Sequence, residues 1–240
     1  MRALLAALAL LVLWTAASAI LGPVLLPSPL AVAERAVDLI RSGELLDHSL
    51  TSLRRMAIGF GTALLFGIPL GILMGRSRVI SDLLLVPIEL LRPISGIAWI
   101  PVGLFLFGVG EKLPIFIIAY AAFFPILLNT VEGVEAAGQR LVVAGRVLGA
   151  SGIKLYTRVV IPAAMPKILN GVRVGLGIAW MAIVAAEFIG APSGLGYMIE
   201  WYRTMLSTES VIAALITIGL IGAAMDLSAR LLARKFAAHE

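Results

Sequence analysis

The sequence of 240 residues contains no cysteine and only two histidines. The absence of cysteine excludes disulfides, thiolate catalysis and cysteine-bound metals. His48 and His239 lie far apart, near the ends of predicted elements, and neither has a partner at a spacing typical of a metal site. The sequence therefore predicts no metal site.

A phosphate-binding loop is also absent. The Walker A pattern places a lysine directly after a glycine, and none of the four lysines follows one. The chain is therefore not expected to hydrolyse ATP, and any energy source would be a partner. An ion-coupled secondary transporter is the alternative, although Glu89, Glu187 and Asp226 are too scattered to form the chain of buried carboxylates usual in such proteins.

Charged residues are scarce, at 14% of the chain, whereas hydrophobic residues make up 60% and the mean hydropathy is +1.04. These values predict an all-α integral membrane protein, because soluble domains contain far fewer apolar residues. The net charge of +5 does not indicate nucleic-acid binding, since the cationic residues are spread through short loops.

Six apolar segments are each long enough to cross a bilayer as a helix, within a single transmembrane domain, 1–240. They comprise residues 3–26, 52–75, 83–107, 113–131, 168–189 and 211–232. A cleaved signal peptide is the alternative for the first segment, but its apolar character continues to Leu26. The distribution of Lys and Arg predicts that both termini are cytoplasmic. Residues 27–50 are expected to form an amphipathic helix on the outer surface.

The second segment carries a series of small residues at four-residue spacing, in which Ala63 joins Gly59, Gly67, Gly71 and Gly75. This spacing puts the small residues on one helical face, where another helix can approach closely. We therefore predict that the four glycines are helix-packing residues.

Few charged side chains lie within the predicted spans. Glu89 and Arg92 are three residues apart in the third segment, which is interrupted by prolines. Because a charge in lipid is costly, the two are expected either to pair or to face a polar cavity. The candidate translocation path also includes Trp99, Trp180 and Glu187. The alternatives are tryptophans that anchor the chain at the interface and a glutamate that caps the glycine-rich loop after it.

A basic stretch, 141–166, separates the fourth and fifth segments on the predicted cytoplasmic side. Its mixture of aliphatic and cationic residues predicts two short amphipathic helices with a turn at 149–152. Pro162 and Pro166 are expected to stop or redirect the second helix before the fifth span. A structured loop of this length is usually functional, and it either lies on anionic lipid or docks a cytoplasmic protein.

This stretch resembles the EAA loop of the permease subunits of bacterial ABC importers. The family pattern is E-A-A, three residues, Gly, nine residues, an aliphatic residue, any residue and an aliphatic-Pro pair. Here Gly149 is followed by Val159 and by Ile161-Pro162, while Val143 stands at the position of the acid. The stretches "LRPISGIAWIPVGLFLFGVGE" and "GVRVGLGIAWMAIVAAEFIGAPSGLG" are similar to the nitrate/sulfonate/taurine branch, so that nearly the whole chain is covered.

The resemblance implies a type I ABC importer permease with the MetI-like fold of six transmembrane helices in the bacterial inner membrane. The chain would form the passage for a small, anionic solute and would not be an enzyme. For such a solute Arg92 is the natural residue to attract charge. The implied partners, besides membrane lipid, are two ATP-binding subunits that hold ATP and Mg, a second permease copy, and a periplasmic or lipid-anchored binding protein. The residues implied to couple to the ATP-binding subunits are Val143, Ala144, Gly145, Arg146, Leu148, Gly149, Ala150, Ser151, Ile161 and Pro162.

Overall fold

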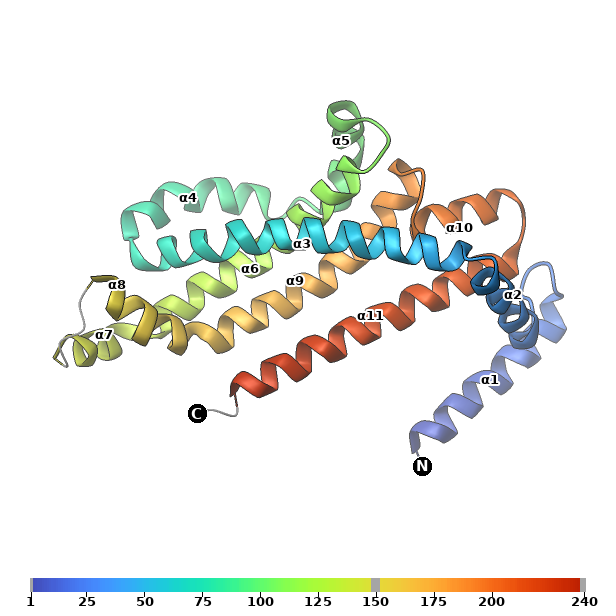
Figure 1. The fold of residues 1–240 in the computed structure, drawn as a ribbon, viewed down its shortest axis with the longest axis horizontal. Coiled ribbons are helices and arrows are strands. Elements are labelled where there is room, and N and C mark those ends of the chain that lie inside the picture. The colour runs from blue at the N-terminus through green and yellow to red at the C-terminus, as the bar shows by residue number, and fades with distance from the viewer. Residues whose placement is uncertain (1, 148–151, 238–240) are drawn as a thin grey trace.

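The computed structural model describes residues 2–147 and 152–237, and every regular element in this part of the chain is a helix (Figure 1). The N-terminal half contains α1 (Arg2–Leu21), α2 (Pro29–Arg41), α3 (Glu44–Arg76), α4 (Arg78–Leu91), the 3-10 helix η1 (Gly96–Trp99) and α5 (Ile100–Phe107). The C-terminal half contains α6 (Lys112–Ala136), α7 (Gly138–Val147), α8 (Gly152–Leu155), the π-helix η2 (Tyr156–Val160), α9 (Ile161–Gly190), α10 (Leu195–Thr204) and α11 (Thr208–Ala237).

Four helical stretches in the described residues are long and apolar enough to cross a membrane: α3, α6, the continuous η2–α9 helix and α11. The bent pair of α4 with η1–α5 is a fifth if it counts as one span. The prediction of an all-helical membrane protein is thus confirmed. The prediction of six spans is matched only in part, because α1 contributes a shorter apolar helix, Leu5–Leu21.

The outer segment differs from the predicted surface helix. α1 ends at Leu21, where Gly22 adopts a left-handed φ of +82° and Pro23 follows. The amphipathic helix α2 forms as expected, capped by Ser28, whose hydroxyl accepts a hydrogen bond from the backbone N–H of Ala31. A second left-handed glycine, Gly43, then starts α3, so residues 44–50 belong to the following span and not to the surface helix.

The third predicted span is not a single straight helix. α4 stops at Leu91, shortly before Pro93, and its direction differs by 80° from that of the helix that follows. A proline has no N–H and disfavours a helical residue before it, which explains the break. Figure 1 shows α4 lying beside α3 while α5 projects away from the bundle.

The prolines at the start of the fifth span do not stop it, and this prediction was wrong. η2 and α9 form one helical stretch, Tyr156–Gly190. Pro162 lies in the first turn of α9, where its missing N–H is tolerated, and the π-helical turn precedes it. Pro166 lies inside the helix. η2 is therefore joined to α9 without a break.

The core is built around α6, which packs against α3 on one side and α9 on the other. α3 and α6 run parallel, and the glycine series faces α6 along its length, at Ile118, Ile126, Thr130 and Val134. The approach is so close that a Cβ added to Gly71 would lie 2.6 Å from Cβ of Thr130. On the other side, Gly171 of α9 would place a Cβ 2.6 Å from Cβ of Asn129. Small residues thus allow the backbones of both helix pairs to approach each other closely.

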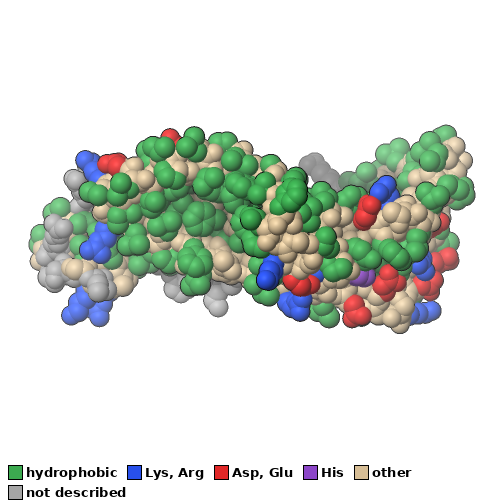
Figure 2. All heavy atoms as spheres, turned by 90° about the horizontal axis from the view of Figure 1, so that it is seen from above, with side chains coloured by type: hydrophobic (Ala, Val, Ile, Leu, Met, Phe, Trp, Pro, Cys, Tyr) green, Lys and Arg blue, Asp and Glu red, His purple; other side chains and the backbone are tan. Residues whose placement is uncertain are grey.

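The helix directions define two ends of the molecule. Because α9 runs opposite to α3 and α6, α7 and α8 lie at one end and α2 and α10 at the other (Figure 1). In the view of Figure 2, hydrophobic side chains cover much of the surface between, while charged side chains gather at the left-hand end and over the right-hand part. α1 diverges from the bundle (Figure 1), and its described contacts include the bond from Trp14 Nε1 to the carbonyl of Pro27, 3.1 Å.

Candidate translocation path and coupling segment

A cavity of about 590 Å³ lies between the end of α4, η1, α6 and α9. Its walls are mostly apolar, and its polar lining side chains are Arg92, Ser95, Tyr120, Asn129 and Glu132. The cavity therefore combines an apolar wall with a few charged and hydrogen-bonding groups, the composition typical of a small-molecule site.

Arg92 lies at the C-terminal cap of α4, on the wall of this cavity. The phenol of Tyr120 on α6 donates to the carbonyl of Leu91 at 2.6 Å, which ties the end of α4 to α6 and positions Arg92. Glu89 is exposed and does not line the cavity, and within the described residues it forms no ion pair with Arg92. Of the two expectations for these residues, the internal pair is not found.

From Arg92 towards the end that carries α7, the contact between α6 and α9 contains two polar pairs that were not predicted from the sequence. Asn170 Nδ2 donates to Asn129 Oδ1 at 2.9 Å, and Lys167 Nζ lies 3.2 Å from Glu132 Oε2. Asn129 is fixed further, because its own Nδ2 donates to the carbonyl of Pro125 at 2.8 Å. The signal was available, since an asparagine within an apolar segment is as unusual as a charge.

The two tryptophans of the predicted path lie outside the cavity lining. Trp180 is almost fully buried between α9 and α11, where its Nε1 donates to the carbonyl of Ile218 at 3.1 Å. A Cβ on Gly222 would lie only 2.8 Å from that nitrogen, so the indole is a packing residue. Trp99 lies in η1 with its ring 5.7 Å from that of Tyr120, and its buried N–H has no partner in the described part of the chain.

Glu187 also lies away from the cavity, in a fully buried polar cluster near the end of α9. Its carboxylate accepts from Ser52, from Arg55 and from the backbone N–H of Gly196. The bond from Gly196 matches the alternative given for Glu187 in the sequence analysis, a glutamate that caps the glycine-rich loop after it. Gly194 has to be a glycine here, because its φ is +106° and a Cβ would collide with the carboxylate.

Arg55 is the centre of this cluster and was not predicted. Its guanidinium bonds Glu187, Glu111 and both the carbonyl and the hydroxyl of Ser193. Arg54 and Arg55 both lie at the start of the second predicted segment, 52–75. The structure buries Arg55 completely, while Arg54 stays exposed and pairs with the same Glu111.

Glu111 lies just before α6, half exposed between the two arginines. The hydrogen bond from Arg55 holds the pKa of this carboxyl below its ordinary value of 4.5, and the charge of Arg55 and the contact with Arg54 add to the effect. Glu111 therefore stays ionised and clamps the start of α6 to α3.

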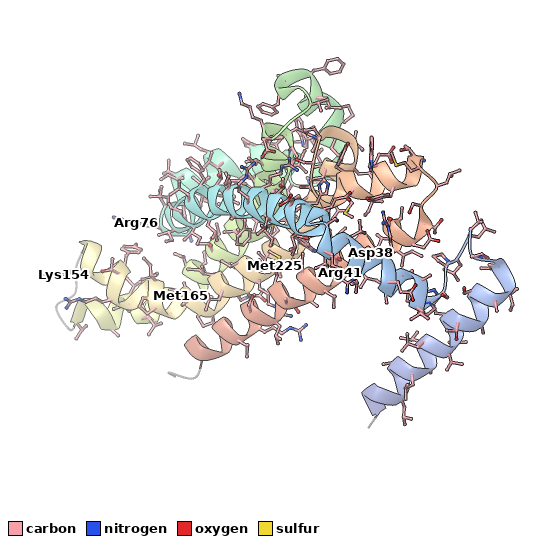
Figure 3. All side chains as sticks on the ribbon, turned by 45° about the vertical axis from the view of Figure 1, so that its right-hand side comes forward. Asp38, Arg41, Arg76, Lys154, Met165 and Met225 are labelled. Carbon is pink, nitrogen blue, oxygen red and sulfur yellow. The ribbon has the colours of Figure 1, made fainter. Side chains whose placement is uncertain are left out.

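The predicted coupling segment forms α7, α8 and η2, at the end of the molecule opposite α2. Figure 3 places Arg76 and Lys154 at this end and Asp38 and Arg41 of α2 at the other. Gly145 of α7 is buried, and a Cβ there would lie 2.7 Å from Cδ1 of Leu155 and 3.3 Å from Cγ2 of Val159. The glycine thus lets α7 pack directly on η2.

The remaining predicted coupling residues are distributed around this contact. Val143 and Ala144 are exposed on α7, and the backbone of Arg146 continues that helix. Ile161 and Pro162 begin α9. Leu148, Gly149, Ala150 and Ser151 lie outside the described residues.

A cation–π contact attaches the same segment to α3. The guanidinium carbon of Arg76 lies 4.6 Å from the ring centroid of Tyr156, and both residues line a second cavity of about 800 Å³ at this end. Such a contact contributes about 0.5–1 kcal/mol at an exposed site. The first turn of the η2–α9 helix is thus held against the end of α3.

Comparison with known proteins gives a family and a set of relatives. Residues 67–238 match the family described as binding-protein-dependent transport system inner membrane component. The taurine transport system permease protein of Escherichia coli is 36% identical over 95% of this chain and 86% of its own length. The nitrate import permease protein of Synechocystis is 37% identical over 84% of this chain and 76% of its own length.

Among solved structures, a chain of the methionine ABC transporter MetNI in an inward-facing conformation is similar in fold. The TM-score is 0.68 at 17% sequence identity, over 80% of this chain and 95% of that chain. At this identity the likeness concerns the fold alone, and it matches the MetI-like architecture expected from the sequence.

Proposed function

The chain belongs to the family of binding-protein-dependent transport system inner membrane components, and from this premise we propose that it forms one half of the passage of an ATP-driven importer for a small anion. As the permease subunit of an ABC transporter it is a multi-pass membrane protein and not an enzyme. The proposal extends this to the path, the solute and the partners.

The observation that carries the proposal is Arg92 on the wall of an apolar cavity, with no carboxylate paired to it in the described residues. Arg92 is exposed, and an unpaired guanidinium at membrane depth is costly unless it faces water or an anion. Glu132, which also lines the cavity, is neutralised by Lys167. A small solute with an anionic group, such as nitrate, a sulfonate or the zwitterion taurine, fits this lining, and two relatives are named for taurine and nitrate transport.

The cavity lies at one side of the chain, and we propose that a second copy completes the passage. In this assembly both termini are cytoplasmic and α1, which is apolar and mostly exposed in its described residues, supplies a sixth span. Two ATP-binding subunits, which hold ATP and Mg, dock on α7 at the cytoplasmic end. A periplasmic or lipid-anchored binding protein delivers the solute at the end formed by α2 and α10.

The fold offers a direct route from the docking segment to the passage. α7 packs on η2 through Gly145, and η2 continues into α9 without a break. α9 in turn contributes Val174, Ile178 and Met181 to the cavity wall. A displacement of α7 by the ATP-binding subunits is therefore passed to the cavity by a rigid helix.

The test uses proteoliposomes that contain the permease, the ATP-binding subunit and the binding protein encoded next to it. Uptake of taurine, methanesulfonate and nitrate is measured with and without ATP inside. The proposal requires co-purification of the permease with the ATP-binding subunit and ATP-dependent uptake of at least one of these anions. If no ATP-binding subunit associates and an ion gradient alone drives uptake, the chain is a secondary transporter and the proposal is wrong.

A further inference from the structure

The seam of α6 and α9 presents polar side chains on an outer face of the bundle. Lys167 and Glu132 are 53% and 60% exposed as a pair, and Asn170 is exposed while Asn129 is half-buried. All four lie within helices that are apolar enough to span a membrane. A face of this composition is not suited to contact with lipid.

The position of the asparagine pair agrees with this conclusion. Asn129 and Asn170 lie within the predicted spans 113–131 and 168–189, two residues from the inner end of each. An exposed amide there that faced hydrocarbon would be left unsatisfied, which costs on the order of 2–7 kcal/mol. The pair therefore faces water or a polar solute.

The face is continuous with the cavity described above. Asn129 and Glu132 belong to the cavity lining, and so do Val174, Ile178 and Met181 of α9. Asn170 lies one helical turn from Val174, so it extends the same face of α9 towards the end that carries α7. The polar pairs thus follow the cavity wall inward.

The pair offers hydrogen-bond donors beside positive charge. Asn129 and Asn170 each use one of the two N–H donors of the amide, so each has a second N–H without a partner in the described part of the chain. The charges that line this face are those of Arg92, Lys167 and Glu132, so that the face carries a net positive charge. A donor beside excess positive charge attracts anions.

We propose that the Asn129–Asn170 pair is a binding subsite for the oxygen atoms of an anion in the inner half of the passage. Asn129 holds Asn170 in position, Asn170 donates to the anion, and Arg92, whose charge no carboxylate in the described residues balances, attracts it along the cavity wall. The proposal rests on the proposed function for the identity of the passage. Its chemistry fits carboxylate, sulfonate and nitrate oxygens, all of which accept such hydrogen bonds.

The absence of cysteine makes the proposal testable without the transported solute. Single cysteines are introduced as Asn170→Cys and Ile178→Cys, with Leu65→Cys as the control on α3, an apolar residue that is 67% exposed. Each purified permease, reconstituted in liposomes, is treated with an anionic and a cationic methanethiosulfonate reagent. We expect both α9 cysteines to react and the Leu65→Cys thiol to remain unmodified, because thiolates form only in water.

The anion subsite is tested in the Ile178→Cys background, where Asn170 is intact. The anionic reagent should react at least about tenfold faster than the cationic one, relative to free thiol, because the face is positive. Methanesulfonate should slow this reaction, and the additional change Asn170→Leu should abolish the slowing. A second change, Thr62→Val on α3, removes an exposed hydroxyl elsewhere and should leave the slowing unaltered.

Two results would overturn the inference. If Asn170→Cys does not react, the face contacts lipid or a protein surface and is not part of a passage. If methanesulfonate slows labelling equally with and without Asn170, the pair does not bind the anion. Neither result depends on ATP-driven uptake, so a failure of the proposed function is recognised separately by the absence of an associated ATP-binding subunit.

Discussion

Arg55 Nη1 lies 2.8 Å from Glu187 Oε1, although the two residues are separated by 132 positions in the sequence and both side chains are completely buried. The contact joins α3 to the end of α9. Glu187 also bonds Ser52 and the loop at Gly196, and Arg55 bonds Ser193 in that loop and Glu111 before α6. Three helices and a loop are therefore fixed relative to one another at the end that bears α2 and α10.

Removing one member of this pair should be strongly destabilising. Arg55→Met leaves Glu187 as an unpaired buried charge, and the free energy of unfolding should fall by about 3–5 kcal/mol. Glu187→Leu should cost less, because Arg55 keeps its ion pair with Glu111. The double variant should lose less than the sum of the two single losses, because no charge is then left alone. Unfolding in detergent micelles measures the values. Arg54→Gln is the control, since Arg54 is 61% exposed and its loss should cost about 1 kcal/mol or less.

Glu111 should make stability depend on pH under acidic conditions. The pKa of Glu111 is held below its ordinary value of 4.5, chiefly by the hydrogen bond from Arg55. The folded state thus binds the proton less tightly than the unfolded state, so the contribution is complete above pH 4.5 and is lost as the pH falls through the lower folded pKa. The difference in unfolding free energy between wild type and Glu111→Gln should shrink over this window. A difference that stays constant down to the most acidic pH would contradict the assignment.

The packing of α3 predicts opposite effects for two of its glycines, Gly71 in the packed series and Gly61 outside it. A Cβ on Gly71 would lie 2.6 Å from Cβ of Thr130 and 2.8 Å from the carbonyl of Leu127, whereas one on Gly61 meets nothing within 4 Å. Gly71→Ala should therefore destabilise the chain by about 1–3 kcal/mol through overpacking. Gly61→Ala should be neutral or stabilising by up to about 1 kcal/mol, because alanine favours the helix. Thermal unfolding of both variants in one detergent decides this.

Arg92 should matter for uptake by its charge. Replacing it with glutamine removes the cation on the cavity wall, and anion uptake at low concentration should fall by about tenfold or more, while Arg92→Lys should retain a measurable part. Uptake in the reconstituted transporter provides the measurement. Arg78→Gln serves as the control, because Arg78 lines the second cavity, at the end that carries α7. Equal uptake by wild type and Arg92→Gln would show that this residue does not attract the solute.

The helical membrane architecture could be predicted from the sequence because it depends on local properties. Apolar length, the spacing of the glycines and the distribution of cations each act within one segment. The break after Leu91 was indicated by Pro93, but the 80° change in direction depends on how the chain packs. Pro162 was misinterpreted because it falls in the first turn of α9, directly after a π-helical turn, and no local pattern distinguishes this arrangement from a stop. Pro166 is tolerated inside α9.

The candidate site was harder to predict, because its parts come from distant segments. Arg92 was expected either to pair with Glu89 or to face a polar cavity, but its place on a cavity wall depends on Tyr120 and on the bend after α4. Arg55 lies near the outer end of a span, a position typical of solvent-facing residues. Its burial depends on the ion pair with Glu187, which comes from the distant helix α9. Asn129 and Asn170 become significant only when α6 and α9 are placed side by side.

The central claim is that movement of the cytoplasmic segment reaches the passage through the contact at Gly145. The most direct measurement compares binding-protein-stimulated ATP hydrolysis by the assembled complex for wild type, Gly145→Val and Gly61→Val. Gly145→Val crowds the contact of α7 with α8 and η2, since a Cβ would already lie 2.7 Å from Cδ1 of Leu155 and 3.3 Å from Cγ2 of Val159, whereas Gly61 has open space. The account predicts that stimulation falls by about fivefold or more in Gly145→Val and is unchanged in Gly61→Val, with both complexes intact. Full stimulation in an intact Gly145→Val complex would contradict it.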